Sequence, residues 1–268
     1  MHRESGAVLI TGGSRGIGAA TARLAARQGY RVAINYRTDG QKAEALLGEI
    51  RASGGEAIAV QADVAGEDQV TRMFWEVDER FGPLTALVNC AGTDGGPKTK
   101  VADLDQTALE RLFAVNVIGT MLCCREAVRR MSTAHGGAGG AIVNVSSMAA
   151  TIGGRPGRSV YAASKGAIDS FTVGFAREVA RERIRVNAIR PGMTLTDMTD
   201  AVRRDPELRA RIAATIAMDR CAEPAEIARP VVWLLSKEAS FVSGAILDAS
   251  GGGFMLAPVA PRAFEKGE

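Results

Sequence analysis

The chain has 268 residues, of which 46% are hydrophobic and 24% are charged, with 33 lysines and arginines against 30 aspartates and glutamates. Such a chain can bury a sizeable core and suits one large α/β domain, and its charges form no basic block of the kind that binds nucleic acid. Uncharged stretches such as residues 114–124 are too short to span a membrane, and residues 1–10 lack the apolar core of a signal peptide. We therefore expect a single-domain, cytoplasmic protein that binds neither nucleic acid nor membrane.

Cysteine and histidine are too sparse to indicate a metal site or a disulfide. The four cysteines, Cys90, Cys123, Cys124 and Cys221, show no CxxC spacing, and the chain has only two histidines. We expect no bound metal.

Seven short aliphatic runs recur along the chain and are typical of strands buried on both faces. They cover residues 7–11, 31–36, 57–61, 86–89, 141–146, 184–189 and 244–249. Segments of helical periodicity lie between them, for example Val70, Phe74, Val77 and Phe81. This alternation predicts an α/β fold with a parallel seven-stranded sheet and helices on both faces. Functional residues are then expected beyond the carboxyl ends of the strands.

A glycine-rich loop, TGGSRGIG at residues 11–18, follows the first strand directly. Gly12, Gly16 and Gly18 permit a tight turn and let backbone N–H groups approach a pyrophosphate at the start of the next helix. The position between a strand and a helix favours nucleotide binding over a plain glycine-rich turn.

The end of the second strand, NYRTDG at residues 35–40, bears on the choice between NAD and NADP. Dinucleotide-binding folds hold the ribose 2′-OH with an acidic residue here, whereas arginine accommodates a 2′-phosphate. Arg37 lies at the strand end and Arg15 lies in the glycine loop, so two guanidinium groups would clamp a phosphate. NADP(H) is therefore favoured over NAD(H). Two alternatives stay open: both arginines are solvated, or Asp39 reaches the ribose.

The stretch VYAASKGA at residues 160–167 places Tyr161 and Lys165 one helical turn apart on the same face. A tyrosine titrates near pH ~10, and a neighbouring ammonium favours the phenolate, which would bring proton exchange closer to neutral pH. An isolated pair of this kind is more commonly a packed tyrosine beside a solvated lysine, so its assignment depends on the rest of the chain.

Seven motifs occur in the order and spacing of one enzyme family. They are TGGSRGIG at 11–18, ADV at 62–64, NCAG at 89–92, NVIG at 116–119, VSS at 145–147, YAASK at 161–165 and RPG at 190–192. Over about residues 5–252 the chain resembles the short-chain dehydrogenase/reductase family. The resemblance implies a single-domain, doubly wound Rossmann fold with a catalytic tetrad of Asn116, Ser147, Tyr161 and Lys165.

The resemblance gives each tetrad residue a role in interconverting a small carbonyl compound and its alcohol. Ser147 would hydrogen-bond the substrate oxygen and Tyr161 would act as general acid/base, while the nicotinamide transfers a hydride. Lys165 would hold the nicotinamide ribose and lower the Tyr161 pKa, and Asn116 would anchor a water that feeds protons toward Lys165. On sequence alone Ser146 competes with Ser147, and Asn116 taken by itself is a buried helix residue.

Further cofactor contacts follow from the resemblance, in addition to Tyr161 and Lys165. Around the glycine loop and the second strand they are Gly12, Ser14, Arg15, Gly16, Ile17, Gly18, Tyr36 and Arg37. Near the adenine and its ribose they are Asp63, Val64, Asn89, Ala91 and Gly92, and near the nicotinamide they are Pro191, Gly192, Thr194 and Thr196. Asp63 taken alone is equally a helix N-cap.

The chain also departs from the family pattern. Cys90 replaces the second asparagine of the usual NNAG, which removes a polar contact. Residues 148–160 are expected to form a loop carrying Arg155 and Arg158, which either recognise an acidic substrate or are solvated. The tail, residues 254–268, has no functional interpretation.

The substrate is less determined than the reaction. Residues 193–215 are expected to form a lid over the site. Some motifs look like glucose-dehydrogenase-like reductases, others like 3-oxoacyl-carrier-protein reductases, in which residues matching Arg129, Arg130 and Arg177 meet the acidic carrier protein. A nucleotide sensor without turnover is a further alternative, against which the complete tetrad argues.

The resemblance also suggests a homotetramer. The helix over residues 161–179 would form part of an interface between subunits, with Ile168, Phe171 and Phe175 on it.

Overall fold

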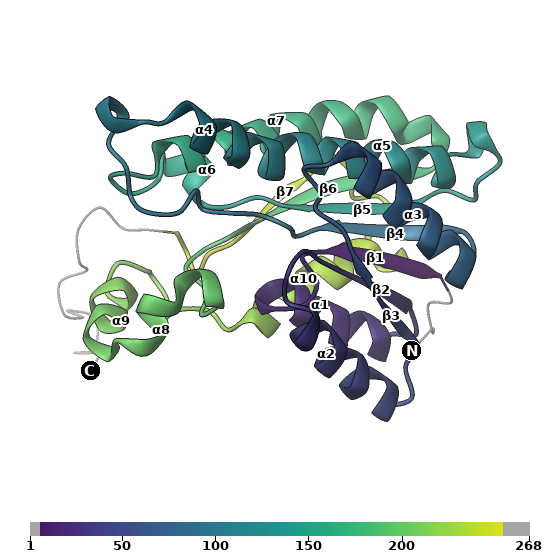
Figure 1. The fold of residues 1–268 in the computed structure, drawn as a ribbon, viewed down its shortest axis with the longest axis horizontal. Coiled ribbons are helices and arrows are strands. Elements are labelled where there is room, and N and C mark those ends of the chain that lie inside the picture. The colour runs from purple at the N-terminus through teal and green to yellow at the C-terminus, as the bar shows by residue number, and fades with distance from the viewer. Residues whose placement is uncertain (1–5, 254–268) are drawn as a thin grey trace, which may run out of the picture.

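Seven parallel strands form one sheet in the order β3-β2-β1-β4-β5-β6-β7 in the computed structural model, which describes residues 6–253 (Figure 1). The strands are β1 (Ala7–Thr11), β2 (Arg31–Tyr36), β3 (Ala57–Gln61), β4 (Leu84–Asn89), β5 (Gly140–Val145), β6 (Ile184–Pro191) and β7 (Ile246–Ala249). The predicted sheet is confirmed, and the predicted strands differ from these only at their ends. The tail, residues 254–268, lies outside the described residues.

Helices cover both faces of the sheet (Figure 1). They are α1 (Gly16–Arg27), α2 (Gly40–Ala52), α3 (Glu67–Phe81), α4 (Gln106–Phe113), α5 (Gly119–Met131), α6 (Ala149–Ile152), α7 (Ser159–Val179), α8 (Asp200–Arg204), α9 (Pro206–Ala213) and α10 (Pro224–Leu235). Side chains of α1, α2 and α10 pack together on one face, and those of α3, α5 and α7 pack on the other. The arrangement is a single-domain, doubly wound Rossmann fold, as expected.

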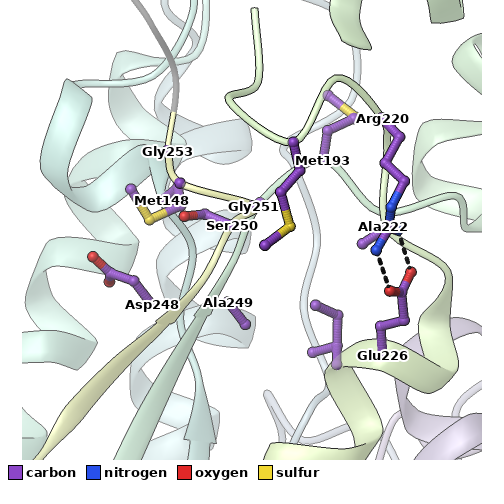
Figure 2. Close-up of a pocket in the computed structure, with 14 residues that line it drawn as sticks. Met148, Met193, Arg220, Ala222, Glu226, Asp248, Ala249, Ser250, Gly251 and Gly253 are labelled. Carbon is purple, nitrogen blue, oxygen red and sulfur yellow. Dashed lines mark hydrogen bonds and ion pairs between the residues drawn. The ribbon is translucent and has the colours of Figure 1, made fainter. Parts of the chain in front are cut away.

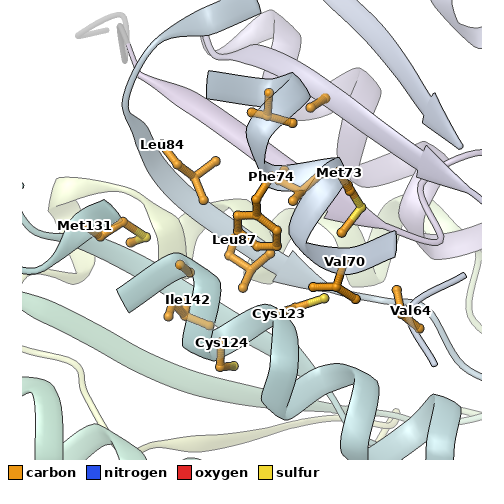
Figure 3. Packing of buried hydrophobic residues seen from close by; sticks show 14 of the residues in the cluster. Val64, Val70, Met73, Phe74, Leu84, Leu87, Cys123, Cys124, Met131 and Ile142 are labelled. Carbon is orange, nitrogen blue, oxygen red and sulfur yellow. The ribbon is translucent and has the colours of Figure 1, made fainter. Parts of the chain in front are cut away.

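Two apolar cores lie on the two faces of the sheet, because successive side chains of a strand point to opposite faces. Leu87 of β4 and Ile142 of β5 join Phe74 of α3 in one core (Figure 3). Val88 and Val143, the next residues of the same strands, lie in the other core. All five side chains are fully buried, and each contributes roughly 2 kcal/mol of transfer free energy. The aliphatic runs therefore set the two-sided architecture.

The helical run Gln106–Met131 is long and apolar enough to cross a membrane by length and composition alone. It joins α4 and α5 through a π-helical turn, η2 (Ala114–Ile118). In the fold its parts pack against α3, α7 and β4, so its apolar residues cover the sheet. Its composition is that of a core helix.

Helix α7 is also packed within the chain. Ile168 and Phe175 are buried, and Phe171 stacks on Phe175 with ring centroids 5.1 Å apart. The expectation that all three side chains present an interface is therefore wrong for Ile168 and Phe175, which the chain's own core covers.

The strand order reverses between β1 and β4, which places a crevice beyond their carboxyl ends. At the same edge of the sheet, residues 193–222 leave the end of β6 and carry α8 and α9 away from the two helix layers (Figure 1). We call this excursion the lid segment. It is closed at its base by a bridge between Thr194 and Ala222.

Candidate active site

The four predicted catalytic residues come from three elements that meet beside the crevice. Ser147 follows β5, Tyr161 and Lys165 lie on the first turns of α7, and Asn116 lies in η2. The Ser147 side chain lies close enough to Tyr161 to lower the pKa of the phenol. A methyl group placed on Gly92 would lie 3.4 Å from Asn116 Oδ1 and 3.6 Å from Lys165 Nζ, so both side chains border one space. The fold therefore brings the tetrad together.

Ser147 rather than Ser146 is available to a substrate. Ser146 is buried, and its hydroxyl donates a hydrogen bond to the carbonyl oxygen of Lys165 at 3.2 Å. Ser147 is half-buried, and its Oγ accepts a hydrogen bond from the amide of Ala149 at 3.1 Å. Consecutive residues at the end of a strand point to opposite sides, which separates the two serines. The geometry favours the predicted choice of Ser147.

The pKa of Tyr161 is raised above its usual value because burial disfavours the phenolate. The hydrogen bond from Ser147 and the charge of Arg158 lower the pKa of Tyr161, while the charges of Asp94 and Cys90 raise it. The expectation that Lys165 brings the Tyr161 pKa below its usual value is therefore wrong for the chain by itself, because the desolvation of the phenol dominates.

Lys165 is almost fully buried, and burial lowers its pKa to about 8. Its ammonium donates a hydrogen bond to the carbonyl oxygen of Val145 at 2.8 Å and lies 5.9 Å from the centroid of the Tyr161 ring. Nearby Cys90 and Asp169 favour the charged form and raise the pKa of Lys165, but less than burial lowers it. A lysine of this kind remains charged at neutral pH yet releases its proton more readily than a surface lysine.

Asn116 is fully buried and ties η2 to the chain segment after β4. Its Oδ1 accepts from the amide of Thr93 at 2.8 Å, and its Nδ2 donates to the carbonyl oxygen of Thr93 at 2.9 Å and to the Ser164 hydroxyl at 3.0 Å. The backbone carbonyl of Asn116 accepts from the Thr120 hydroxyl at 3.0 Å. The side chain thus fixes the wall of the site, and the water-anchoring role stays a prediction.

The glycine loop has the geometry that a pyrophosphate requires, and the helix that follows it begins without a side-chain cap. Gly12 has a positive φ of 61°, and a Cβ on Gly18 would lie 2.4 Å from the carbonyl oxygen of Gly12. The N-cap of α1, Arg15, makes no side-chain cap hydrogen bond, and the first turn has no acidic residue. By contrast, an aspartate caps each of α2, α4 and α9. The residues present therefore fit a dinucleotide, whose phosphates would meet the uncapped amides.

Asn35 holds this loop, although the sequence argument did not single it out. It is buried at the end of β2, and its side chain accepts from the amide of Gly12 at 3.2 Å and donates to the carbonyl oxygen of Ala62 at 3.0 Å. One side chain thereby connects the loop to the end of β3. In the sequence, the feature that could have indicated this role is an asparagine inside the mostly aliphatic run at residues 31–36.

The remaining contacts predicted near the glycine loop lie on its rim. Ser14 and Ile17 are half-buried, as is Tyr36 at the end of β2, whereas Arg15 and Arg37 are exposed. Asp39 caps α2 through Lys42 N at 3.3 Å and pairs with Lys42 Nζ at 3.2 Å. These contacts lower the pKa of Asp39. Its carboxylate is thus already in use, which weakens the alternative that it holds a ribose.

Two residues predicted near the adenosine have other partners in the structure. Asp63 pairs with Arg111 at 2.6 Å and accepts from the amide of Ala65 at 3.0 Å, while α3 begins only at Glu67, so Asp63 is a turn residue and not a helix N-cap. Asn89 is buried, and its Nδ2 donates to Asn144 Oδ1 at 2.9 Å. The Asn89 side chain is thus directed into the protein interior, which leaves only its backbone for a ribose.

The other predicted contacts border the crevice. Val64 is buried against Gly119 at the start of α5, and the amides of Cys90 and Ala91 each donate to the Thr11 hydroxyl at 3.1 Å. Gly92 faces Asn116 and Lys165. Thr11, the first residue of the TGGSRGIG motif, is a further positioning residue that was not among the predicted contacts.

A cavity of about 580 Å³ opens beyond the ends of β6 and β7 (Figure 2). Met148 and Met193 line it near Gly192, and the ion pair of Arg220 with Glu226 borders it. Pro191 ends β6 and Gly192 follows it, and the amide of Gly192 donates to the carbonyl oxygen of Ala249 at 2.9 Å. This cavity adjoins the strand end where the nicotinamide contacts were predicted.

Thr194 and Thr196 lie at the base of the lid segment. The carbonyl oxygen of Thr194 accepts from the Thr199 hydroxyl at 2.6 Å, and Thr196 forms a capping box with Thr199. A methyl group on Gly16 would lie 3.2 Å from Thr196 Cγ2, so the lid segment touches the glycine loop. Both threonines are placed near the predicted cofactor site.

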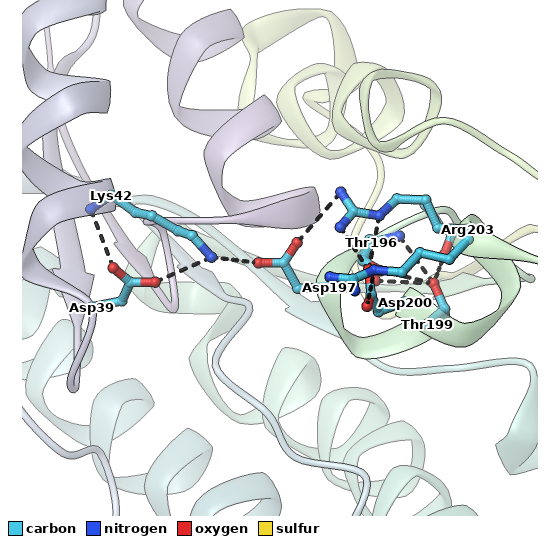
Figure 4. A network of polar contacts seen from close by, with 9 residues as sticks. Asp39, Lys42, Thr196, Asp197, Thr199, Asp200 and Arg203 are labelled. Atoms are coloured by element: carbon cyan, nitrogen blue, oxygen red, sulfur yellow. Dashed lines mark hydrogen bonds and ion pairs between the residues drawn. The ribbon is translucent and has the colours of Figure 1, made fainter.

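An ion-pair chain joins the lid segment to α2 (Figure 4). Lys42 Nζ lies 3.2 Å from Asp39 and 2.8 Å from Asp197, and Asp197 lies 3.9 Å from Arg203. Arg15 is close enough to lower the pKa values of Asp39 and Asp197. The chain thus connects the predicted phosphate end of the site to the lid segment.

A smaller cavity, of about 130 Å³, lies beside Tyr161. The segment after β4, the start of α4 and the start of α7 line it, and its wall includes Asp94, Leu109 and Arg158. Residues 148–160 were expected to be a loop, but α6 and the start of α7 occupy part of them. Within residues 6–253, no group of three or more His, Cys, Asp or Glu side chains is placed to hold a metal ion.

Comparison with known proteins finds relatives along most of the chain. Residues 12–253 match the family described as enoyl-(acyl carrier protein) reductase. The uncharacterized oxidoreductase YgfF of Escherichia coli is 48% identical over 91% of this chain and 98% of that protein. The 3-oxoacyl-acyl-carrier-protein reductase FabG of Staphylococcus aureus is 36% identical over 92% of this chain and 97% of that one. A short chain dehydrogenase from Burkholderia cenocepacia, crystallised in complex with NADP, superposes with a TM-score of 0.83 at 33% identity and covers 94% of this chain and 99% of that chain.

Proposed function

Because the chain belongs to the short-chain dehydrogenase/reductase family, whose members are oxidoreductases, we propose that it is an NADP(H)-dependent enzyme in which Tyr161 is the general acid/base. It interconverts a small carbonyl compound and its alcohol. The observation that carries the proposal is the placement of Ser147 beside Tyr161, with Lys165 buried one helical turn further along α7 and a glycine loop whose first helical turn has no side-chain cap.

The mechanism uses each side chain in the position described. Bound NADP(H) supplies or accepts the hydride. Ser147 donates a hydrogen bond to the substrate oxygen, which orients the carbonyl and stabilises the charge that develops on it. In reduction the Tyr161 hydroxyl donates its proton to that oxygen, and in oxidation the Tyr161 phenolate takes the proton back. Lys165 binds the nicotinamide ribose, and its positive charge stabilises the phenolate.

Asn116 holds together the two chain segments that border the site. By holding Thr93 and Ser164 it fixes the distance between the segment after β4 and the start of α7. It also anchors the water that returns protons to Lys165. Reaction rates depend steeply on such distances, because reacting atoms must meet within about 3 Å.

NADP(H) is the cofactor we propose, in preference to NAD(H). Arg15 in the glycine loop and Arg37 after the end of β2 are exposed, while Asp39 is occupied by the cap of α2 and by Lys42. A guanidinium pairs well with a phosphate, whereas an occupied carboxylate is a poor partner for a ribose hydroxyl. The Burkholderia relative that was crystallised with NADP supports the same choice.

We expect Arg37→Ala to weaken NADPH binding by about tenfold or more and NADH binding by less than twofold, because only NADPH carries the 2′-phosphate. The measurement is fluorescence titration of both cofactors. Arg23→Ala is the matched control, since Arg23 is a partly exposed arginine that pairs with Glu49 away from the predicted cofactor site. Equal losses for both cofactors would rule out a phosphate contact at Arg37.

The substrate class we propose is a small neutral carbonyl or alcohol, with glucose or another sugar as one candidate. The cavity beside Tyr161 is small, and three carboxylates, Asp94, Asp103 and Asp105, line it. Arg158, which was considered as a recognition group for an acidic substrate, is paired with Asp94 at 2.8 Å. A negatively charged substrate would be repelled by the three carboxylates.

Reduction of a 3-oxoacyl group on a carrier protein is the second candidate, and the identity with the Staphylococcus reductase favours it. Of the residues considered for carrier contact, Arg177 is exposed, and Arg129 is exposed although it pairs with Glu126 at 2.8 Å. Arg130 is not available, because it pairs with Asp78 at 2.6 Å and lies over the Phe74 ring. The carrier contact would therefore rest on the other two arginines.

The proposal is tested by NADPH consumption with a panel of aldoses, 3-oxoacyl thioesters, diketones and quinones. We expect one class to be turned over, and Tyr161→Phe to lower kcat by about 10³-fold or more because the proton donor is removed. Ser159→Ala, on the same helix, is the control. Turnover that survives in Tyr161→Phe would refute the assignment of the acid/base.

The lid segment closes over bound substrate, and the enzyme assembles as a homotetramer in the cytoplasm. Exposed Trp233, Phe241 and Leu247 on and beyond α10 support assembly, because large apolar side chains at the surface favour interfaces. Light scattering tests this, and a monomer at micromolar concentration would exclude a stable tetramer.

A further inference from the structure

Arg158 is joined to the segment after β4 by three contacts. Its Nη1 donates to the carbonyl oxygens of Asp94 at 2.9 Å and Gly96 at 2.6 Å, and its Nη2 lies 2.8 Å from the Asp94 carboxylate. Both side chains are partly sheltered, with 21% of Arg158 and 32% of Asp94 exposed. A planar guanidinium can bind a carboxylate and two carbonyls at once, whereas an ammonium is a single point of charge.

These contacts tie the start of α7, which carries Tyr161, to the chain segment after β4. Arg158 is the N-cap residue of α7, three residues before Tyr161. The segment that it holds begins at Thr93, which Asn116 holds from the other side at 2.8 Å and 2.9 Å. Arg158, Asp94 and Tyr161 line the same small cavity. The wall beside Tyr161 is therefore fixed at one end by an amide and at the other by a guanidinium.

We propose that Arg158 is a positioning residue for the reaction, which clamps residues 94–96 onto the start of α7 and, together with Asp94, sets the charge balance beside the Tyr161 hydroxyl. This inference rests on the proposed role of Tyr161. Arg158 donates its observed hydrogen bonds to Asp94 and Gly96. It therefore affects Tyr161 by holding residues 94–96 in place and by its positive charge.

The two partners of the ion pair act on Tyr161 in opposite directions. The positive charge of Arg158 lowers the pKa of Tyr161 and the negative charge of Asp94 raises it. Several other titratable or charged groups surround the phenol or its cavity. They are Lys165 on α7, Cys90 after β4, and Asp103 and Asp105 before α4.

This opposition separates the proposal from a purely structural role. Arg158→Gln and Asp94→Asn both break the ion pair, and a structural effect would change the site in the same way in both variants. The charge effect predicts that Arg158→Gln moves the titration of Tyr161 to higher pH and Asp94→Asn moves it to lower pH. Arg158→Lys keeps the charge but not the three-point clamp.

The first readout is the titration of tyrosine labelled with ¹³C at Cζ, followed by NMR. The chain has only three tyrosines, and Tyr161→Phe assigns the signal. We expect the midpoint to rise in Arg158→Gln, to fall in Asp94→Asn and to stay near the wild-type value in Arg158→Lys. Arg23→Gln, which breaks the exposed pair with Glu49, is the matched control and should leave the midpoint in place.

The second readout is the pH dependence of alcohol oxidation with NADP⁺, using the best alcohol from the substrate panel. Oxidation needs the phenolate, so its rising limb should move in the same directions as the NMR midpoint. Arg158→Lys should keep the limb in place while KM rises several-fold, because the wall is loosened.

Shifts in the same direction in both neutralising variants, or no shift beyond that of Arg23→Gln, would overturn the proposal. Circular dichroism over the same pH range marks where each variant is folded, and only midpoints within that range are compared. If Tyr161 does not titrate within the pH range of the folded protein in any variant, the oxidation kinetics are decisive. A rising limb that stays at the same pH in every variant then overturns the proposal. Opposite NMR shifts without turnover of any substrate would reject the proposed enzyme activity and retain the charge balance at Tyr161.

Discussion

The catalytic wall and the lid segment are stabilised in opposite ways. The wall, which comprises residues 90–96, 114–118 and 145–165, is held by hydrogen bonds of buried side chains such as Asn116 and Ser164. The lid segment is held by ion pairs such as Lys42 with Asp197, whose side chains are 50% and 31% exposed. Breaking a buried hydrogen bond costs about 1–3 kcal/mol, whereas an exposed ion pair contributes about 0–1 kcal/mol.

The difference indicates which region holds atoms in place and which can move. The wall carries the proposed proton-transfer groups, whose relative positions must be kept for the proposed reaction. The lid segment has its own small core of Val202, Ile212, Ile216 and Cys221, so α8 and α9 can shift as a unit without exposing the main core. Weak contacts at its edge suit the proposed opening and closing of the lid segment in each turnover.

The largest effect should come from breaking the wall at Asn116. Asn116→Ala removes the partner of Thr93 N, of Thr93 O and of the Ser164 hydroxyl, all in the interior. We expect a loss of about 3 kcal/mol in unfolding free energy and a fall in kcat of about 10²-fold. Urea unfolding and steady-state kinetics measure the two. Gln106→Ala, an exposed change at the start of α4, serves as the control; a stability loss for Asn116→Ala no larger than this control's would mean that the wall is not held as described.

Lys165→Met should separate function from stability within the wall. Lowering the Lys165 pKa from 10.5 to about 8 means that burial of the ammonium costs about 3 kcal/mol. Replacing it by an uncharged chain should therefore raise stability by about 2 kcal/mol at pH 7, after the lost hydrogen bond to Val145, while activity disappears.

The dependence of the unfolding free energy on pH tests the cost of burying the Lys165 ammonium. Between pH 8 and 10.5 the unfolded Lys165 keeps its proton while the folded Lys165 has released it, so the stability of the wild type rises with pH in this window. The variant lacks this rise. Its advantage should be complete below pH 8 and should vanish by about pH 10.5 in denaturant titrations at several pH values. A constant difference across that range would contradict the burial cost.

The smallest effect should come from the edge of the lid segment. Lys42→Ala breaks the link between Asp39 and Asp197 and should lower global stability by less than about 1 kcal/mol. It should nonetheless increase cleavage of residues 193–222 in limited proteolysis, because the segment opens more often. Asp205, which caps α9 without crossing to α2, offers the control Asp205→Asn. A loss as large as that of Asn116→Ala would remove the distinction between the two regions.

Local sequence patterns were sufficient for the strands, the glycine loop and the spacing of the tetrad. An aliphatic run such as residues 7–11 is buried on both faces whatever surrounds it, and the i, i+4 spacing of Tyr161 and Lys165 fixes their shared face once the helix forms. The register of seven motifs then selected Ser147 over Ser146.

Contacts between distant parts of the chain were decided by the tertiary structure. Asp94 and Arg158 are 64 residues apart, and no spacing rule relates them. Asp39 was available to a ribose in the sequence, but the start of α2 takes its carboxylate. The Tyr161 pKa was expected to follow its neighbour on the helix, but burial by the surrounding elements outweighs that neighbour. Sequence thus determined which chemical groups are present and in what order, because periodicity and motif spacing are local. Only the fold decided their partners and their charge states, because burial and long-range contacts depend on the whole chain.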